Sequence, residues 1–270
     1  MGAFSHWWIF GREARRRRLL RRRAIPAAEW SAVLDAAPVL WPLSADERRR
    51  LHDLVVVFLA EREFEGCGGV VLDDRLRRLI AAQACLLVLE LDLDAFRNVG
   101  SVLVYPRGYR TRRHHEDEFG IVSEGDDELL GEAWNDGPVI LNVEDVLDVA
   151  EGEPFNLVLH EFAHKLDMLD GDEDGVPPLP RGLDADTWRR DFAAAREDLA
   201  RRERRGEEPP IDPYAAEDEA EGFAVLTETF FCAPWLLEAE YPRVYAQLRA
   251  FYRQDPLARD DALAEIGSRP

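Results

Sequence analysis

Apolar residues recur at helical spacing along most of the chain, and strand-like patterns are short and few. Ser44 and Glu47 form a capping box, and the apolar residues after them lie on one helical face. The same reasoning predicts further helices over residues 27–34, 73–91, 187–205, 218–231, 234–240 and 241–254, with Asp218 as the cap of the helix over 218–231. Short strands are predicted at the end of 65–72, over 101–105 and at the end of 134–143. These elements indicate an α+β fold that is mostly helical and has a small sheet.

Charge is distributed unevenly. The chain has 54 acidic and 34 basic residues, for a net charge of −20, yet residues 12–23 include eight arginines. We expect residues 1–25 to be an arginine-rich, mobile N-terminal tail and residues 26–270 to form a single domain. The acidic body excludes direct nucleic-acid binding, because phosphate contacts need a basic face. Arg75, Arg77 and Arg78 fall in the first turns of the predicted 73–91 helix, where we expect them to reach solvent.

The cysteines and the hydropathy pattern indicate where the protein acts. The three cysteines are far apart and odd in number, which argues against a disulfide framework. No run of 18 apolar residues occurs, so we predict no transmembrane segment. The apolar residues at the N-terminus precede the arginines, which is the reverse of the order in a secretory signal. We therefore expect a cytoplasmic protein.

The segment FNLVLHEFAHKLDMLDG, residues 155–171, contains the H-E-x-x-H pattern of zinc peptidases. His160 and His164 are four residues apart, so on a helix both imidazoles lie on one face and can reach one metal ion. Glu161 lies beside them, where its carboxylate can accept a proton from a water molecule. Apolar residues would bury this helix on most sides, and buried charged groups need a partner. The adjacent pair His114-His115 makes a poor chelate, and we expect it in a solvated loop.

Several acidic residues could complete the metal site. Asp170 stands where a metzincin has its third ligand, but Asp167 occupies the place of the glycine that ends the metzincin helix. We therefore expect the helix to continue past Asp167 and to carry Asp170 away from the metal. Glu221 precedes a glycine and an apolar run, so it should face the buried side of a later helix. Glu228, seven residues further on, shares that face and could instead support a ligand histidine, as could Asp167 or Asp170. A structural zinc site would need four ligands rich in cysteine. The segment Asp170–Gly175 lacks the glutamate of a calcium loop, so we expect it to be a solvated acidic turn.

Longer strings then carry a family resemblance. They are SVLVYP at 101–106, GEAWNDGPVILN at 131–142, NLVLHEFAHKLDMLDG at 156–171, GVPPLP at 175–180, DPYAAEDEAEGFAVLTETFF at 212–231 and FYRQDP at 251–256. With them the chain resembles the Mlc titration factor A family of glucose-regulated, zinc-dependent metallopeptidases, which is similar to the catalytic domain of anthrax lethal factor. The resemblance covers nearly all of the chain after residue 25.

The resemblance implies a mostly helical, zincin-like domain in which a small sheet edges the active-site cleft. It assigns Zn2+ to His160, His164 and Glu221, makes Glu161 the catalytic base and places Tyr214 opposite the reacting carbonyl. The implied activity is peptide hydrolysis of an aminopeptidase-like kind. The family name also implies a regulatory binding protein that sequesters a transcriptional repressor, and one chain can do both. An intact Glu161 favours activity, because binding alone would not require it.

Overall fold

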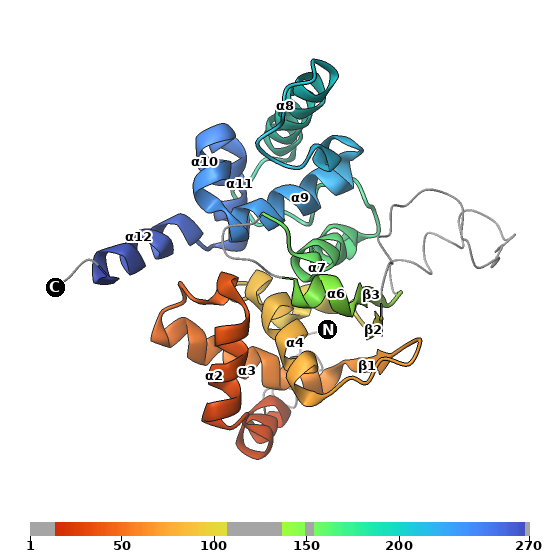
Figure 1. The fold of residues 1–270 in the computed structure, drawn as a ribbon, viewed down its shortest axis with the longest axis vertical. Coiled ribbons are helices and arrows are strands. Elements are labelled where there is room, and N and C mark those ends of the chain that lie inside the picture. Colours follow the sequence, from red (N-terminus) through yellow and green to blue (C-terminus); the bar gives the residue numbers. More distant parts are fainter. Residues whose placement is uncertain (1–13, 107–136, 149–153, 268–270) are drawn as a thin grey trace, which may run out of the picture.

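A computed structural model describes residues 14–106, 137–148 and 154–267 of the 270-residue chain. His114 and His115 lie outside these residues. The α-helices are α2 (Ala27–Ala36), α3 (Ala45–Glu61), α4 (Asp74–Leu87), α6 (Val143–Leu147), α7 (Leu157–Asp167), α8 (Ala185–Arg204), α9 (Glu219–Cys232), α10 (Pro234–Glu240), α11 (Pro242–Tyr252) and α12 (Pro256–Gly267). Four short 3-10 helices, η1 (Pro38–Leu40), η2 (Leu93–Phe96), η3 (Met168–Asp170) and η4 (Pro213–Ala216), connect some of them. The predicted mostly helical α+β fold is confirmed (Figure 1).

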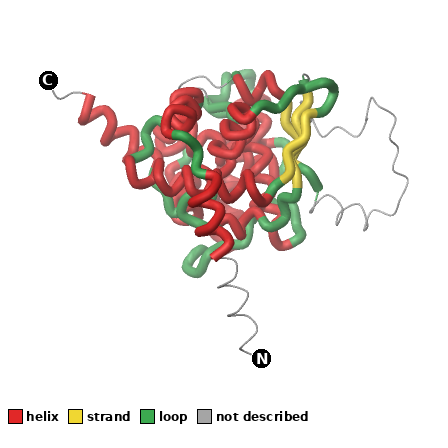
Figure 2. The backbone as a smooth tube through the Cα atoms, turned by 90° about the horizontal axis from the view of Figure 1, so that it is seen from below, coloured by secondary structure: helices red, strands yellow, loops and turns green. Residues whose placement is uncertain are grey.

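One three-stranded sheet lies at one side of the helical body (Figure 2). Its strands, β1 (Glu63–Gly66), β2 (Ser101–Tyr105) and β3 (Val139–Asn142), run parallel in the order β1-β2-β3. The strands predicted at 101–105 and at the end of 134–143 are β2 and β3. The prediction of a strand after the glycines at 66–69 is wrong, because β1 ends at Gly66. Gly68 and Gly69 have positive φ and turn the chain out of the sheet, and Val71 beyond them is 87% exposed.

Helix α7, which carries the H-E-x-x-H pattern, packs between α4 and α9 (Figure 1). Phe162 on α7 is fully buried, with its ring centroid 5.0 Å from that of Phe96 and 5.8 Å from that of Phe58 on α3. Burial of one such side chain contributes roughly 1.5–3 kcal/mol. The aromatic cluster therefore fixes α7 against the N-terminal helices. A second aromatic cluster joins α8, α9 and α11 through Trp188, Phe192, Phe223 and Phe251.

Polar contacts hold the C-terminal end of α7, whose last carbonyls have no partner within the helix. Asn98 donates a hydrogen bond of 2.8 Å to the carbonyl of Lys165, and Arg97 donates one of 2.7 Å to that of Leu169. The buried Lys165 ammonium donates to the carbonyl of Gly137, 2.9 Å away, and so ties α7 to the segment that leads into β3. The position of α7 is thus set at its end as well as along its buried face.

Several other expectations can be compared with the structure. Ser44 forms the predicted capping box with Glu47, and Asp218 caps α9. Helix α12 was not predicted. Residues 14–23 of the predicted tail are helical, and Arg16 pairs with Asp92 and Asp94. The division into a tail and one domain stays a prediction. No helix among the described residues is long and apolar enough to span a membrane.

Candidate metal centre

The first two candidate ligands come from one turn of α7. Asn156 caps this helix, because its side-chain oxygen accepts a hydrogen bond of 3.1 Å from the backbone N–H of Leu159. The imidazoles of His160 and His164 then lie on one face, with their ring centroids 4.8 Å apart. Their Nε2 atoms are separated by 3.2 Å. Both side chains are largely buried, at 12% and 4% exposure. The helical spacing thus brings the two nitrogens together as the sequence predicts.

Helix α9 brings Glu221 to the same point. Its Oε2 lies 3.1 Å from His160 Nε2 and 3.5 Å from His164 Nε2. The backbone N–H of Glu221 donates to the capping Asp218, so the carboxylate projects from the first turn of the helix. Gly222 permits close packing here, since a Cβ at this position would lie 2.5 Å from the Arg196 side chain and 3.1 Å from the carbonyl of Ala215. The first turn of α9 can therefore approach η4.

The three groups fit a metal ion. Ligand atoms placed tetrahedrally at about 2.0–2.1 Å from a zinc ion are about 3.3 Å apart, close to the 3.1, 3.2 and 3.5 Å observed here. Glu221 Oε2 is buried, and despite its short distances it makes no aligned hydrogen bond with any described residue. Among the described residues, His160, His164 and Glu221 are the one group of His, Cys, Asp or Glu side chains that could hold a metal.

Glu228 explains why His160 presents its Nε2 atom. Glu228 is buried on α9, and its Oε1 accepts a hydrogen bond of 2.7 Å from His160 Nδ1. With Nδ1 bonded to Glu228, Nε2 is the nitrogen of His160 that faces Glu221 and His164. The other oxygen of Glu228 accepts from the backbone N–H of Asn156, 2.6 Å away, and the Asn156 side chain donates to Gln83 at 2.7 Å. One buried network therefore caps α7 and orients His160.

The charges around the three candidate ligands favour a bound cation. Burial alone would lower the pKa of His160, but the carboxylates of Glu228 and Glu221 outweigh it and raise the pKa well above its ordinary value. Burial opposes ionisation of Glu221, yet the two imidazoles bring its pKa far below the usual range. The site therefore holds negative charge and stabilises positive charge beside it.

Tyr214, on η4, lies next to His160 of α7. The two rings are stacked, with centroids 6.3 Å apart and an angle of 27° between their planes. Burial and the nearby Glu221 carboxylate raise the pKa of Tyr214 above its ordinary value, so the hydroxyl keeps its proton at neutral pH. A half-buried Tyr214 can thus donate a hydrogen bond to a group bound near His160.

The alternative acidic residues have other surroundings. The prediction that the α-helix continues past Asp167 is wrong. Helix α7 ends at Asp167, and the 3-10 turn η3 that follows it ends before Gly171, which has a φ of 107°. Asp170 is not part of the metal-binding group. Asp167 accepts a hydrogen bond of 2.9 Å from the backbone N–H of Gly175, and burial together with nearby acidic groups raises its pKa to about 8.

Sequence reasoning missed Glu173. Its Oε1 lies 3.5 Å from His164 Nδ1, a buried atom with no hydrogen-bond partner among the described residues. The acidic turn after α7 was expected to be solvated, and residues 170–173 are indeed exposed, yet the turn also brings Glu173 close to His164. Gly175 allows this, because a Cβ there would lie 2.3 Å from the carbonyl of Glu219. The density of acidic residues directly after the motif is the signal that could have pointed to Glu173.

Replacement of Glu228 should weaken metal binding without removing a proposed ligand. Glu228→Gln loses one of two buried acceptors, because the amide nitrogen must face either His160 or the N–H of Asn156. We expect the affinity for zinc to fall about 10–100-fold. Competition with a chromogenic chelator measures this affinity.

Glu238→Gln, at an exposed position of α10, is the matched control and should bind zinc like the unchanged protein. Circular dichroism must show that Glu228→Gln keeps its helical content. A folded Glu228→Gln protein whose affinity lies within twofold of the control would contradict the positioning role.

Comparisons with known proteins agree on one family. The model of the glucose-regulated metallo-peptidase M90 family matches residues 11–253. The chain is 40% identical over 235 residues to Mlc titration factor A of Serratia proteamaculans, covering 86% of this chain and 89% of the relative. It is 39% identical over 233 residues to Mlc titration factor A of Pectobacterium atrosepticum, covering 85% and 87%. The protein of the same name from Yersinia pestis is 37% identical over 235 residues, covering 86% of each. The chain therefore belongs to the glucose-regulated metallo-peptidase M90 family, as its motifs predicted.

Proposed function

We propose that this protein is a zinc-dependent peptidase, of the class that adds a downstream glutamate to H-E-x-x-H, and that it hydrolyses short peptides in an aminopeptidase-like manner. The convergence of His160 Nε2, His164 Nε2 and Glu221 Oε2 supports it most directly. Two imidazoles and one carboxylate are a common protein ligand set of catalytic zinc, which keeps a further position for water or substrate. Membership in a metallopeptidase family supports the same conclusion.

Zinc held by these residues would polarise the scissile carbonyl and lower the pKa of a water molecule from about 15.7 to about 7. Glu161, half-buried next to His160, is the general base in this proposal. It accepts the proton of the attacking water and passes it to the leaving amine, so that one water and one amide give a carboxylic acid and an amine. Tyr214 keeps its proton and donates a hydrogen bond to the carbonyl oxygen as negative charge develops there.

The substrate class follows from the resemblance to peptidases that act on free N-termini. The net charge of −20 agrees with it, because an acidic protein attracts the ammonium group of a short peptide. We place this activity in the cytoplasm, because Cys67, Cys85 and Cys232 are free thiols.

Glu161→Gln should retain zinc and lose peptide hydrolysis by about 10²–10⁴-fold, because the amide cannot accept the proton. Glu221→Ala should lose most of its zinc. Zinc content is measured by inductively coupled plasma mass spectrometry. Hydrolysis is followed on a peptide library with and without chelator.

Glu238→Gln again serves as the control. An active Glu161→Gln protein would disprove the proposed mechanism, and full zinc content in Glu221→Ala would remove Glu221 from the ligand set.

A second candidate function is the sequestration of a transcriptional repressor. The relatives are named Mlc titration factor A, and each match covers most of both chains. Such binding needs a partner surface and not a working base. A purified Mlc repressor should therefore bind the unchanged protein and Glu161→Gln with equal affinity in isothermal titration calorimetry. No binding to the unchanged protein would dismiss this function, and loss in Glu161→Gln alone would tie the partner to the catalytic site.

A further inference from the structure

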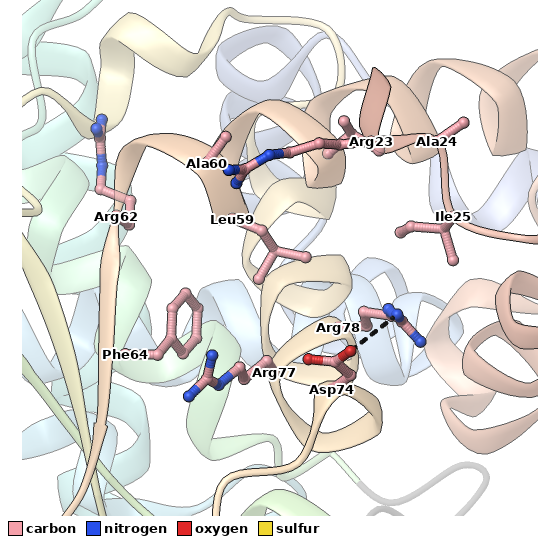
Figure 3. Close-up of a pocket in the computed structure, with 11 residues that line it drawn as sticks. Arg23, Ala24, Ile25, Leu59, Ala60, Arg62, Phe64, Asp74, Arg77 and Arg78 are labelled. Carbon is pink, nitrogen blue, oxygen red and sulfur yellow. Dashed lines mark hydrogen bonds and ion pairs between the residues drawn. The ribbon is translucent and has the colours of Figure 1, made fainter. Parts of the chain in front are cut away.

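A pocket remote from the metal centre lies between the C-terminal half of α3, the strand β1 and the first turns of α4 (Figure 3). Its volume is about 250 Å³, and neither the three candidate ligands nor Glu161 line it. Apolar side chains form much of the wall, namely Ile25, Val56, Leu59, Ala60 and Phe64. The polar side chains of the lining are Arg23, Arg62, Arg77, Arg78 and Asp74.

Four arginines against one aspartate is an unusual balance in a protein of net charge −20. Arg78 is neutralised within the fold, because it pairs with Glu29 and with Asp74, the latter at 3.4 Å. Arg62 donates hydrogen bonds to the carbonyls of Phe96 and Glu61. Arg23 and Arg77, by contrast, pair with no carboxylate in the part of the chain that the structure describes. Two positive charges therefore face the pocket without a counter-charge.

Arg77 supplies a second, independent observation. Its Nε atom is buried and has no hydrogen-bond acceptor among the described residues. A buried donor on a charged group is costly when it stays unsatisfied. In the close-up, Arg77 lies between Phe64 and Asp74, and Arg23 lies on the other side of Leu59 (Figure 3). An acceptor placed in the pocket could satisfy Arg77 and lie within the field of Arg23.

Another arginine-lined pocket among the described residues differs in its ion pairs. It has a volume of about 330 Å³ and is bordered by Arg189 and Arg196. Arg189 pairs with Asp174 at 3.0 Å, and Arg196 pairs with Glu219 at 2.7 Å. Arg196 Nε is also buried without a hydrogen-bond partner among the described residues, but both guanidinium groups of this pocket already have a carboxylate partner, so it gives less reason to expect an anion.

We propose that the pocket of Arg23 and Arg77 binds a small organic anion, in which a phosphate monoester or carboxylate is attached to an apolar group. Guanidinium groups form paired hydrogen bonds with both kinds of oxyanion. The apolar wall would cover the remainder of the ligand, and the volume limits it to about the size of a substituted benzene ring. This site is independent of zinc and of peptide hydrolysis.

The test uses the full-length, zinc-loaded protein and four probes in isothermal titration calorimetry. They are phenyl phosphate, phenylacetate, inorganic phosphate and the neutral 2-phenylethanol. We expect at least one of the two aromatic anions to bind with a Kd between about 10 μM and 1 mM. 2-Phenylethanol should bind at least about tenfold more weakly, because it lacks the charge. Failure of both aromatic anions to bind below 10 mM would overturn the proposal.

Matched variants locate the binding. Arg77→Gln and Arg23→Gln should each lower the affinity for the aromatic anion by about tenfold or more, since each removes a charged partner. Arg75→Gln, at an exposed position on the same helix, makes the same change of charge and should have no effect. Arg23 is also exposed, so its variant stays informative if Arg77→Gln fails to fold. Undiminished binding in the folded pocket variants would place the anion elsewhere, including at the metal, and overturn the proposal.

A phosphate monoester is also the head group of the lipid phosphatidic acid. Flotation with vesicles of phosphatidic acid, compared with phosphatidylcholine vesicles, separates the two sources. The proposal expects little binding to either vesicle and Arg77-dependent binding of the soluble anion. Arg77-dependent binding to phosphatidic acid vesicles without binding of phenyl phosphate or phenylacetate would identify a membrane site and contradict a soluble ligand.

Discussion

The close packing of α7 on α9 brings buried imidazoles and carboxylates together, and the candidate site depends on it. His164, Glu221 and Glu228 are each about 3% exposed, where removal of a charge from water costs several kcal/mol. These groups are compatible with a stable fold because each faces an opposite charge or a hydrogen-bond partner. Glu228 is satisfied by His160 and by the backbone of Asn156. Glu221 is left facing two imidazole nitrogens, and a cation is the natural complement of this arrangement.

The surrounding fold explains how this packing is achieved. Gly222 removes the side chain that would keep α9 from η4, and Gly175 lets the acidic turn after α7 lie against the start of α9. Aromatic contacts through Phe162 fix α7 from its other side. Because Asn156 both caps α7 and binds Glu228, the position of the helix and the orientation of His160 are set by one network.

Some of this could be predicted from the sequence, for clear physical reasons. The spacing of His160 and His164 is local, so helical geometry alone places both nitrogens on one face. Capping residues such as Ser44 and Asp218 act within one turn, and both were predicted. Glu221 and Glu228 share a helical face, so which of them meets which histidine atom depends on how α9 lies along α7. The residue pattern favoured Glu221 as the ligand but left Glu228 and Asp170 open, and the family resemblance decided for Glu221.

Other features depend wholly on tertiary structure. The apolar residues after Gly69 resemble a strand, but β1 forms earlier because residues 63–66 pair with β2. Arginines in the first turns of α4 were expected in solvent, yet packing of α3 and residues 23–25 around them leaves Arg77 with a buried, unsatisfied nitrogen. The protein thus combines an acidic candidate metal centre with a separate basic pocket, and a ligand of opposite charge would stabilise each.

X-ray absorption at the zinc edge of the stoichiometrically loaded protein tests the central claim most directly. We expect a first shell of nitrogen and oxygen at about 2.0–2.1 Å with the scattering of two imidazoles. A shell containing sulfur at about 2.3 Å, or one without imidazole scattering, would contradict it.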